Sequence, residues 1–293
     1  MSRTEAASSG DKSTAARRHP RSSRPTPSVM LAGAILALGA AAVALPFVWM
    51  LASSVKPRSE STAYPPVPLP SDPTLEYFRQ LFSELDFGRY LVNTLALVAI
   101  SLIGLLFMTM AGYGFSKYEF RGKKILFFMV LATMMIPVQV TMIPSYLILN
   151  GAGLTNTLVG IALPTLVSGY SIFLFRQFMS SIPNEVIEAA RIDGASEMRI
   201  FWQIVLPMSK PILSVQVILT FIGAWNSFLW PLVMASDQSL YTLSVGVSLL
   251  NQQTATNPSL QMAASTVMVL PILIVFLFFQ RYIVQGFSTS GSK

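Results

Sequence analysis

The chain has 293 residues, of which 53% are hydrophobic and only 11% are charged. Because a soluble domain usually carries about a quarter charged residues, this composition argues against a water-soluble globule. The formal net charge of +7 does not indicate nucleic-acid binding, since the basic residues lie between apolar segments, where they set membrane topology. The sequence has no cysteine and one histidine in a polar tail, so we expect no disulfide, no catalysis by these residues and no metal site.

Long stretches of the chain carry no charged residue. They cover residues 25–55, 90–116, 125–175, 211–236 and 238–280. A bilayer span requires roughly 20 predominantly apolar residues, so these stretches hold six spans. The pattern therefore predicts an all-α polytopic membrane protein with six transmembrane helices.

The termini and the first loop differ in composition from the rest. Residues 1–28 are a basic tail of small and polar residues, which we expect to be disordered and cytoplasmic. The first span, residues 29–52, is longer than the apolar core of a signal peptide, so an uncleaved helix is favoured over a cleaved leader. A proline-rich outer loop occupies 53–89. A core at 90–284 then holds spans two to six, and residues 285–293 form a short polar tail.

Turn residues and charges divide this core. We place spans two to six at about 90–115, 125–149, 157–178, 212–235 and 259–283. An Asn- and Gly-rich turn at 150–156 separates spans three and four. The segment 181–211 between spans four and five is charged, and a polar loop at 236–258 precedes the last span.

Lysine and arginine are distributed unevenly between the two sides of the predicted membrane. With both termini in the cytoplasm, the inner segments carry 16 of these residues and the outer segments carry four. Cytoplasmic loops of membrane proteins are enriched in basic residues. We therefore expect both termini and the segment 181–211 inside, and the loops at 53–89 and 236–258 outside.

The spans lack deeply placed ionisable residues, which proton and ion relays through membranes normally require. A proton-coupled secondary transporter is therefore disfavoured, although sodium coupling through backbone carbonyls stays open. No G-x-x-x-x-G-K-[ST] motif is present, so ATP that drives transport must be bound by another chain. Prolines within the spans are compatible both with ordinary helix bending and with a moving pathway.

A few polar side chains interrupt the apolar spans. Gln139, Gln216 and Asn226 are candidates for contact with a solute or for lining a water path. Such groups more often hydrogen-bond to neighbouring helices, at about 0.6–2 kcal/mol each. The residues alone favour that second interpretation.

The segment 181–211 has the pattern of two short helices joined at a glycine. We expect Asn184 to cap the first helix, where Glu185 and Glu188 complement its positive end. Gly194 supplies a left-handed or close-contact position where this helix ends. Small alanines on one face and acids on another suit a docking surface for a partner. We favour this over an amphipathic helix lying on the membrane, because that helix would carry basic residues.

A second helix is expected to start near Ser196. Its apolar residues are expected to form one face, and Leu206-Pro207 to stop the helix. That face consists of Met198, Phe201, Ile204 and Val205. The segment thus predicts a rigid docking element that transmits motion from a partner to the spans.

Several stretches resemble known permeases. One segment of this chain resembles the EAA loop of ABC importer permeases, both in its residues and in their spacing. The matching residues are Glu188-Ala189-Ala190, Asp193-Gly194-Ala195, Ile204 and Leu206-Pro207. The stretches 224–231 and 280–286 are similar to maltose-type, MalG-like sugar permeases, and the resemblance runs from about Met30 to the end of the chain. One departure is Ser227, where that family often has Asp or Glu, so no role is assigned to an acid there.

The resemblance implies a type I ABC importer permease fold, with no enzymatic activity and no cofactor bound by this chain. It implies a sugar importer in the bacterial inner membrane, where two separate ATPase subunits bind ATP. It also implies a heterodimer with a second permease, a solute-binding protein that docks outside, and transport by alternating access. The residues it assigns to ATPase coupling are Glu185, Glu188, Ala189, Ala190, Asp193 and Gly194.

The amide-rich loop after span five also receives a role from the resemblance. In maltose-type permeases this loop probes the sugar-binding cleft of the docked binding protein, which implies that role for Asn251, Gln252 and Gln253. Composition alone favours a solvated connector. By the same resemblance, the tail at 285–293 reaches toward the ATPases.

Two other functions stay open. One is an importer for a non-sugar solute such as glycerol phosphate. That solute calls for Arg or Lys near the pathway, which no span supplies, although a partner subunit could. The other is a secondary transporter, which the spans without ionisable residues and the EAA-like loop both disfavour.

Overall fold

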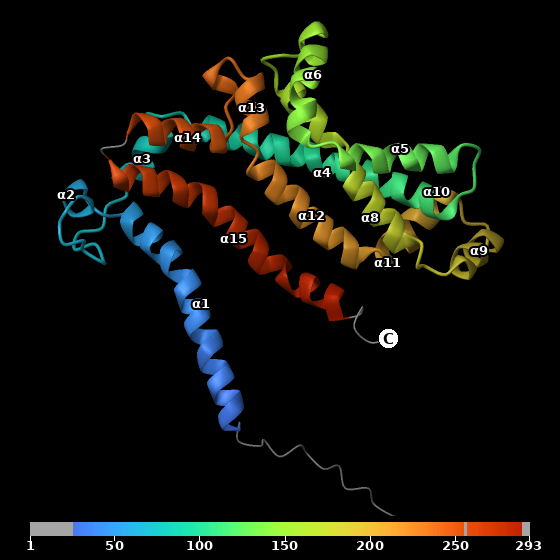
Figure 1. The fold of residues 1–293 in the computed structure, drawn as a ribbon, viewed down its shortest axis with the longest axis horizontal. Coiled ribbons are helices and arrows are strands. Elements are labelled where there is room, and N and C mark those ends of the chain that lie inside the picture. Colours follow the sequence, from blue (N-terminus) through green and yellow to red (C-terminus); the bar gives the residue numbers. More distant parts are fainter. Residues whose placement is uncertain (1–25, 255–256, 289–293) are drawn as a thin grey trace, which may run out of the picture. The chain divides into compact units, whose positions relative to one another are not determined.

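The structure is a computed structural model that describes residues 26–254 and 257–288, with only the backbone for Gln253 and residues 281–288. The described residues form helices and connecting turns, with no β-strand among them. The chain divides into two compact units, one up to Phe47 and one from Val48 onward. The first unit holds most of helix α1 (Pro27–Ser54). The second contains all other helices and is described by itself below (Figure 1).

The elements of the second unit follow one another with short connections. They are α2 (Arg58–Ser61), α3 (Glu76–Ser83), α4 (Phe87–Lys117), α5 (Lys123–Met135), α6 (Val138–Gly151), α7 (Leu158–Ala162), η1 (Leu163–Leu166), α8 (Gly169–Met179), α9 (Asn184–Ile192), α10 (Glu197–Ile200), the π-helical η2 (Phe201–Val205), α11 (Leu206–Met208), α12 (Lys210–Trp225), α13 (Leu229–Met234), η3 (Gln238–Leu240), α14 (Leu243–Gln253) and α15 (Pro258–Ser288).

Four helical stretches of the described chain are long and apolar enough to cross a membrane. They cover Pro27–Ser54, Phe87–Lys117, Leu158–Met179 and Pro258–Gln280. Two bent helix pairs bring the number of spans to six if each pair counts as one span. The fold is therefore all-α and polytopic, as the sequence predicts.

The third predicted span is not one continuous helix. Helices α5 and α6 meet at an angle of 107° instead of forming a single rod over residues 125–149. The break lies at Ile136, which is extended before Pro137. A residue that precedes proline is pushed out of the helical region, and this explains the position of the bend. Figure 1 shows α6 turning sharply away from α5.

The fifth predicted span is also interrupted. The preceding helical segment does not stop at Leu206-Pro207 but continues to Met208, and it turns by 82° into α12 at Ser209. Helix α12 ends at Trp225, and α13 begins only at Leu229, so the predicted span 212–235 contains two helices.

Helix α4 organises the core of the second unit by packing against α8 and α12 (Figure 1). Two glycines permit this contact. A Cβ atom at Gly104 would lie 2.5 Å from the Leu166 carbonyl oxygen, and one at Gly112 would lie 2.4 Å from the Phe175 Cβ. Only glycine allows the backbones to approach so closely.

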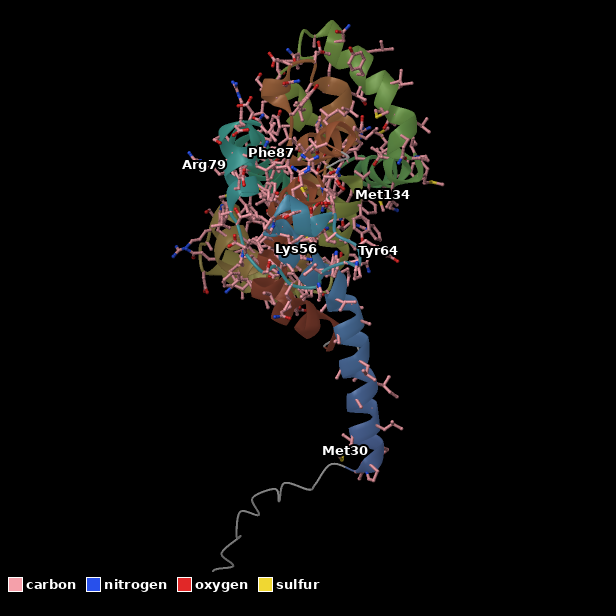
Figure 2. All side chains as sticks on the ribbon, turned by 90° about the vertical axis from the view of Figure 1, so that its left-hand side faces the viewer. Met30, Lys56, Tyr64, Arg79, Phe87 and Met134 are labelled. Carbon is pink, nitrogen blue, oxygen red and sulfur yellow. The ribbon has the colours of Figure 1, made fainter. Side chains whose placement is uncertain are left out.

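The predicted loop at 53–89 has its own structure. It contains α2 and α3, and Lys56 is only 2% exposed, with its Nζ donating to the Val67 carbonyl oxygen and lying 4.3 Å from the Trp49 ring centroid. In Figure 2, Arg79 points outward from α3, whereas Phe87, at the start of α4, is buried. The segment is thus folded, and its helices pack against α4 and α15.

The predicted loop at 236–258 is mostly helical too. It holds η3 and α14, which buries Leu243 and Leu250 in the core formed with α4 and α15. At the other end, α15 continues to Ser288, beyond the predicted start of the tail at 285. Residues 289–293, and residues 1–25 of the predicted N-terminal tail, lie outside the described residues.

Candidate functional site

The charged segment after α8 is a helix, a tight turn and a second helix. Helix α9 ends at Ile192, and Gly194 has a φ of +80°. The Gly194 N–H donates to the Arg191 carbonyl oxygen at 3.0 Å, and the Ala195 N–H donates to the Ala190 carbonyl oxygen, also at 3.0 Å. This pair of bonds is a Schellman motif, in which a left-handed residue ends the helix. Glycine meets that need without strain.

An ion pair closes the same turn. The Arg191 guanidinium donates to both carboxylate oxygens of Glu197, with Nε–Oε1 at 2.6 Å and Nη2–Oε2 at 3.3 Å. The Tyr118 hydroxyl, just beyond α4, donates to Glu197 Oε2. These donors hold the pKa of Glu197 below its usual range, Arg191 contributing more than Tyr118. The turn is therefore anchored to the end of α4.

The residues predicted for ATPase coupling divide between two faces of α9. Glu185, Glu188, Ala189 and Asp193 are exposed, whereas Ala190 packs inward beside Ile187. The expectation that both alanines share one face is wrong, because adjacent residues on a helix point about 100° apart. The outward face instead combines the acids with exposed Val186 and with Ile192, which is 87% exposed.

Two details of the predicted helix pair also differ. Asn184 is the first residue of α9 rather than its cap, and its Oδ1 accepts from the Lys117 Nζ at 2.8 Å. The second helix, α10, starts directly after Ser196, as expected, and Ser196 caps it by accepting from the Arg199 N–H. Phe201 and Val205 are buried, but Met198 is 54% exposed and does not belong to their face.

Gly194 has no close neighbour among the described residues. A Cβ added there would find none of their atoms within 4 Å. Of the two alternatives predicted for this residue, a left-handed backbone or a close contact, the described part of the chain shows the left-handed backbone.

A pocket whose lining mixes hydroxyl-bearing and apolar side chains, called the polar pocket below, lies among α4, η1, α8 and α12. Its volume is about 260 Å³, and its lining carries hydroxyls but no charged group: Ser101, Met108, Thr165, Ser168, Tyr170, Ser171, Gln216, Leu219, Thr220, Gly223 and Ala224. Gln216 is 1% exposed, and its Nε2 has no hydrogen-bond partner among the described residues. A buried amide donor without a partner costs about 1–3 kcal/mol, so it favours a ligand or water in this pocket.

The other two polar candidates lie elsewhere. Gln139 lines a second pocket of about 370 Å³ between α6 and the start of α13, together with Ser227 and Trp230. Thr165 belongs to both pockets, so η1 separates them. Asn226 is exposed at the end of α12 and donates back to the Ile222 carbonyl oxygen.

The amide-rich segment begins on a helix rather than in a loop. Asn251 and Gln252 are exposed in the last turn of α14, and Gln261 of α15 donates to the carbonyl oxygens of Asn251 and Thr254. The side chain of Gln253 and residues 255–256 lie outside the described residues.

Sequence reasoning missed Tyr118 and the hydroxyl groups of the first pocket. Tyr118 lies far from Glu197 in the sequence, and no local pattern connects the two. The Thr165 hydroxyl donates to the Ala162 carbonyl oxygen of its own turn, and the Ser101 hydroxyl has the Leu97 carbonyl oxygen and the Thr165 hydroxyl as alternative acceptors. Their convergence is visible only in three dimensions.

Comparison with known proteins identifies the class. The family described as "Binding-protein-dependent transport system inner membrane component" matches residues 108–289, and the chain belongs to it. It is an integral inner-membrane permease of an ABC importer that depends on a solute-binding protein, and it is not an enzyme. A bacterial ABC transporter involved in the import of the acidic polysaccharide alginate has the same fold, with a TM-score of 0.77 and 23% identity over 89% of this chain and 99% of that chain.

Individual relatives differ in the solute that their names give. The arabinooligosaccharides transport system permease protein AraQ of Bacillus subtilis is 35% identical over 217 residues, 74% of each chain. The diacetylchitobiose uptake system permease protein NgcG of Streptomyces coelicolor is 32% identical over 260 residues, 87% of this chain and 86% of that protein. The sn-glycerol-3-phosphate transport system permease protein UgpE of Yersinia pestis is 36% identical over 203 residues, 68% and 72% of the two chains.

Proposed function

We propose that this chain forms half of the translocation pathway of an ATP-driven importer for an uncharged sugar or oligosaccharide. Membership of the permease family and the uncharged, hydroxyl-lined pocket around Gln216 support this function. Amides and hydroxyls both donate and accept hydrogen bonds, so they match the hydroxyl groups of a sugar. Two of the relatives named above are permeases for oligosaccharides.

The partners follow from the mode of transport. A second, different permease completes the pathway, and two ATPase subunits dock below the permeases, one of them at the outward face of α9 through its acids and exposed apolar residues. Both termini, the α9–α10 segment and the loop after α4 face the cytoplasm, since most basic residues lie there. ATP binding closes the ATPase dimer, the α9–α10 turn carries that motion into α4, and the pathway opens toward the binding protein.

Gln216 provides the test of the pathway. Gln216→Met keeps the length of the side chain but removes its amide, so solute uptake by cells that express the complete importer should fall about tenfold, the effect of one buried hydrogen bond. The matched control is Asn226→Leu at the end of the same helix, because Asn226 does not line this pocket, and uptake should stay within twofold of the wild type. Wild-type uptake by the Gln216 variant would exclude this pocket from the pathway.

A glycerol phosphate importer is the second candidate, since a relative of equal similarity carries that solute in its name. A phosphate group calls for a basic residue, and neither pocket lining contains one. Ligand binding by the cognate binding protein separates the two candidates. Selective binding of glycerol phosphate, with no binding of oligosaccharides, would overturn the sugar assignment.

The end of α14 is proposed to reach the sugar-binding cleft of the docked binding protein. Asn251 and Gln252 are exposed there and offer amides to a hydroxyl-rich ligand. Replacing residues 251–257 by a Gly/Ser linker of equal length should keep the complex assembled but lower uptake several-fold. Unchanged uptake would leave this segment as a connector.

A further inference from the structure

A basic pocket lies between α5 and α8 and shares no lining residue with the coupling turn or with the polar pocket. Its volume is about 390 Å³, and it is lined by Glu119, Lys123, Lys124, Phe127, Phe128, Leu131 and Arg176. The lining therefore combines three cations and one carboxylate with three large apolar side chains. None of these residues has a role in the transport mechanism described above.

The charges in this pocket do not balance. Lys123 is paired with Glu119 at 2.8 Å, and its Nζ also donates to the Tyr118 carbonyl oxygen. Within the described part of the chain, no carboxylate lies within ion-pair distance of Lys124 or Arg176. Two positive charges thus remain uncompensated, and they favour an anion in the pocket.

Arg176 is held in place for such a contact. Its guanidinium lies 3.9 Å from the Phe127 ring centroid, and its Nε donates to the Phe115 carbonyl oxygen at 3.4 Å. These contacts use one face and one N–H of the group. Its two terminal nitrogens have no acceptor among the described residues, and such a pair can bind two oxygens of a phosphate.

The N-terminus of α5 also favours an anion in this pocket. The helix begins at Lys123 after Gly122, whose φ is +86°, and no side chain caps it. Backbone N–H groups and the helix dipole favour an anion at this end. Directly after it, the helix is apolar, with Ile125 64% and Phe128 69% exposed. The basic groups therefore lie where a membrane-spanning segment meets its polar loop.

We infer that this pocket binds the headgroup of an anionic phospholipid from the cytoplasmic leaflet. Arg176 and Lys124 contact the phosphate, and Phe128 and Leu131 contact an acyl chain. The apolar wall distinguishes a lipid from a free phosphate ion, which would gain nothing from it. Basic pockets beside spans on the cytoplasmic side suit such headgroups. The inference uses the topology proposed above but not the identity of the solute.

Binding of short-chain lipids to the purified importer, assembled with its partner subunits in detergent, tests this inference. Dioctanoyl phosphatidylglycerol should bind at least tenfold more tightly than dioctanoyl phosphatidylcholine. Arg176→Gln should weaken phosphatidylglycerol binding about tenfold and Lys124→Gln about fivefold. Arg121→Gln is the matched control, because Arg121 is an exposed cation of the same loop that does not line the pocket, and its effect should stay within twofold.

Several outcomes would overturn the inference. Equal affinity for the two lipids, or equal loss in the Arg121 and Arg176 variants, would remove the headgroup site. Full competition by inorganic phosphate at the same concentration would identify a free-anion site. A photo-crosslinker at Phe128 that captures a partner subunit instead of lipid would identify a protein interface. Arg176→Lys keeps the charge but loses the stacked guanidinium and its pair of terminal nitrogens, so its affinity should fall between those of the wild type and Arg176→Gln. If Arg176→Gln does not assemble, the Lys124→Gln variant, at an exposed position, provides the test.

Discussion

Substitutions at Gly194 separate the backbone role of this residue from its role in docking. Its φ of +80° costs a non-glycine residue about 1–2 kcal/mol, so Gly194→Ala should lower the equilibrium constant for forming the turn roughly five- to thirtyfold. Because a Cβ there meets no atom of residues 26–254 and 257–288 within 4 Å, Gly194→Leu should destabilise the isolated permease no more than Gly194→Ala. Gly194→Asn should cost less than either, since asparagine tolerates left-handed backbone.

Docking of an ATPase at the turn should change the relative severity of the alanine, asparagine and leucine variants. If a partner packs closely against Gly194, the leucine variant should lose ATPase co-purification and solute uptake, whereas the alanine and asparagine variants keep most of both. The measurements are uptake in cells, ATPase retained on the affinity-purified permease, and thermal unfolding of the permease alone. Leucine and alanine variants with the same uptake would refute a close contact at this position.

Three further predictions concern other parts of the chain. The hydrogen bonds that lower the pKa of Glu197 stabilise the turn above about pH 4.3, the ordinary carboxyl value, and this stability is lost as the pH falls through the lowered pKa. Thermal unfolding should therefore show an acid-induced loss below about pH 4 that is smaller in Glu197→Gln. Gly112→Ala should destabilise the protein by about 1–3 kcal/mol through overpacking, whereas Gly114→Ala, with open space around it, should not. A cysteine that replaces Asp237 should react with a membrane-impermeant maleimide in intact cells. A cysteine that replaces Arg121 should react only after the membrane is permeabilised. The opposite labelling pattern would show that the proposed membrane topology is inverted.

The spans were predictable because length and hydropathy determine them, but their breaks were not. Proline occurs in several spans, yet only at Pro137 does it coincide with a bend of 107°. At Pro46, Pro144 and Pro271 the helix continues through the proline. A proline weakens the helix wherever it occurs, and the packing around it decides whether the helix breaks.

The coupling turn was predictable in outline because its determinants are local. A glycine that ends a helix and a serine that starts the next are recognisable in sequence, whereas the direction of Ala190 into the core depends on α4 and α8. The polar pocket is the opposite case. Gln216 was visible as a polar residue in an apolar span, but its missing hydrogen-bond partner emerges only when three helices are placed around it.

Helix α4 connects the two sites physically. Tyr118, at its end, donates to the coupling turn, and Ser101, about 25 Å away at 1.5 Å per residue, lines the polar pocket. Between them, Gly104 and Gly112 allow η1 and α8 to contact the helix backbone, and the Thr165 hydroxyl of η1 accepts from that of Ser101 at 2.8 Å. A closely packed unit of this kind moves as a body rather than deforming, since interiors have low compressibility. A displacement of the turn should therefore reach the pocket through α4 and α8 together. Loosening their contact at Gly112 should lower uptake more than ATPase binding, because the turn itself stays intact.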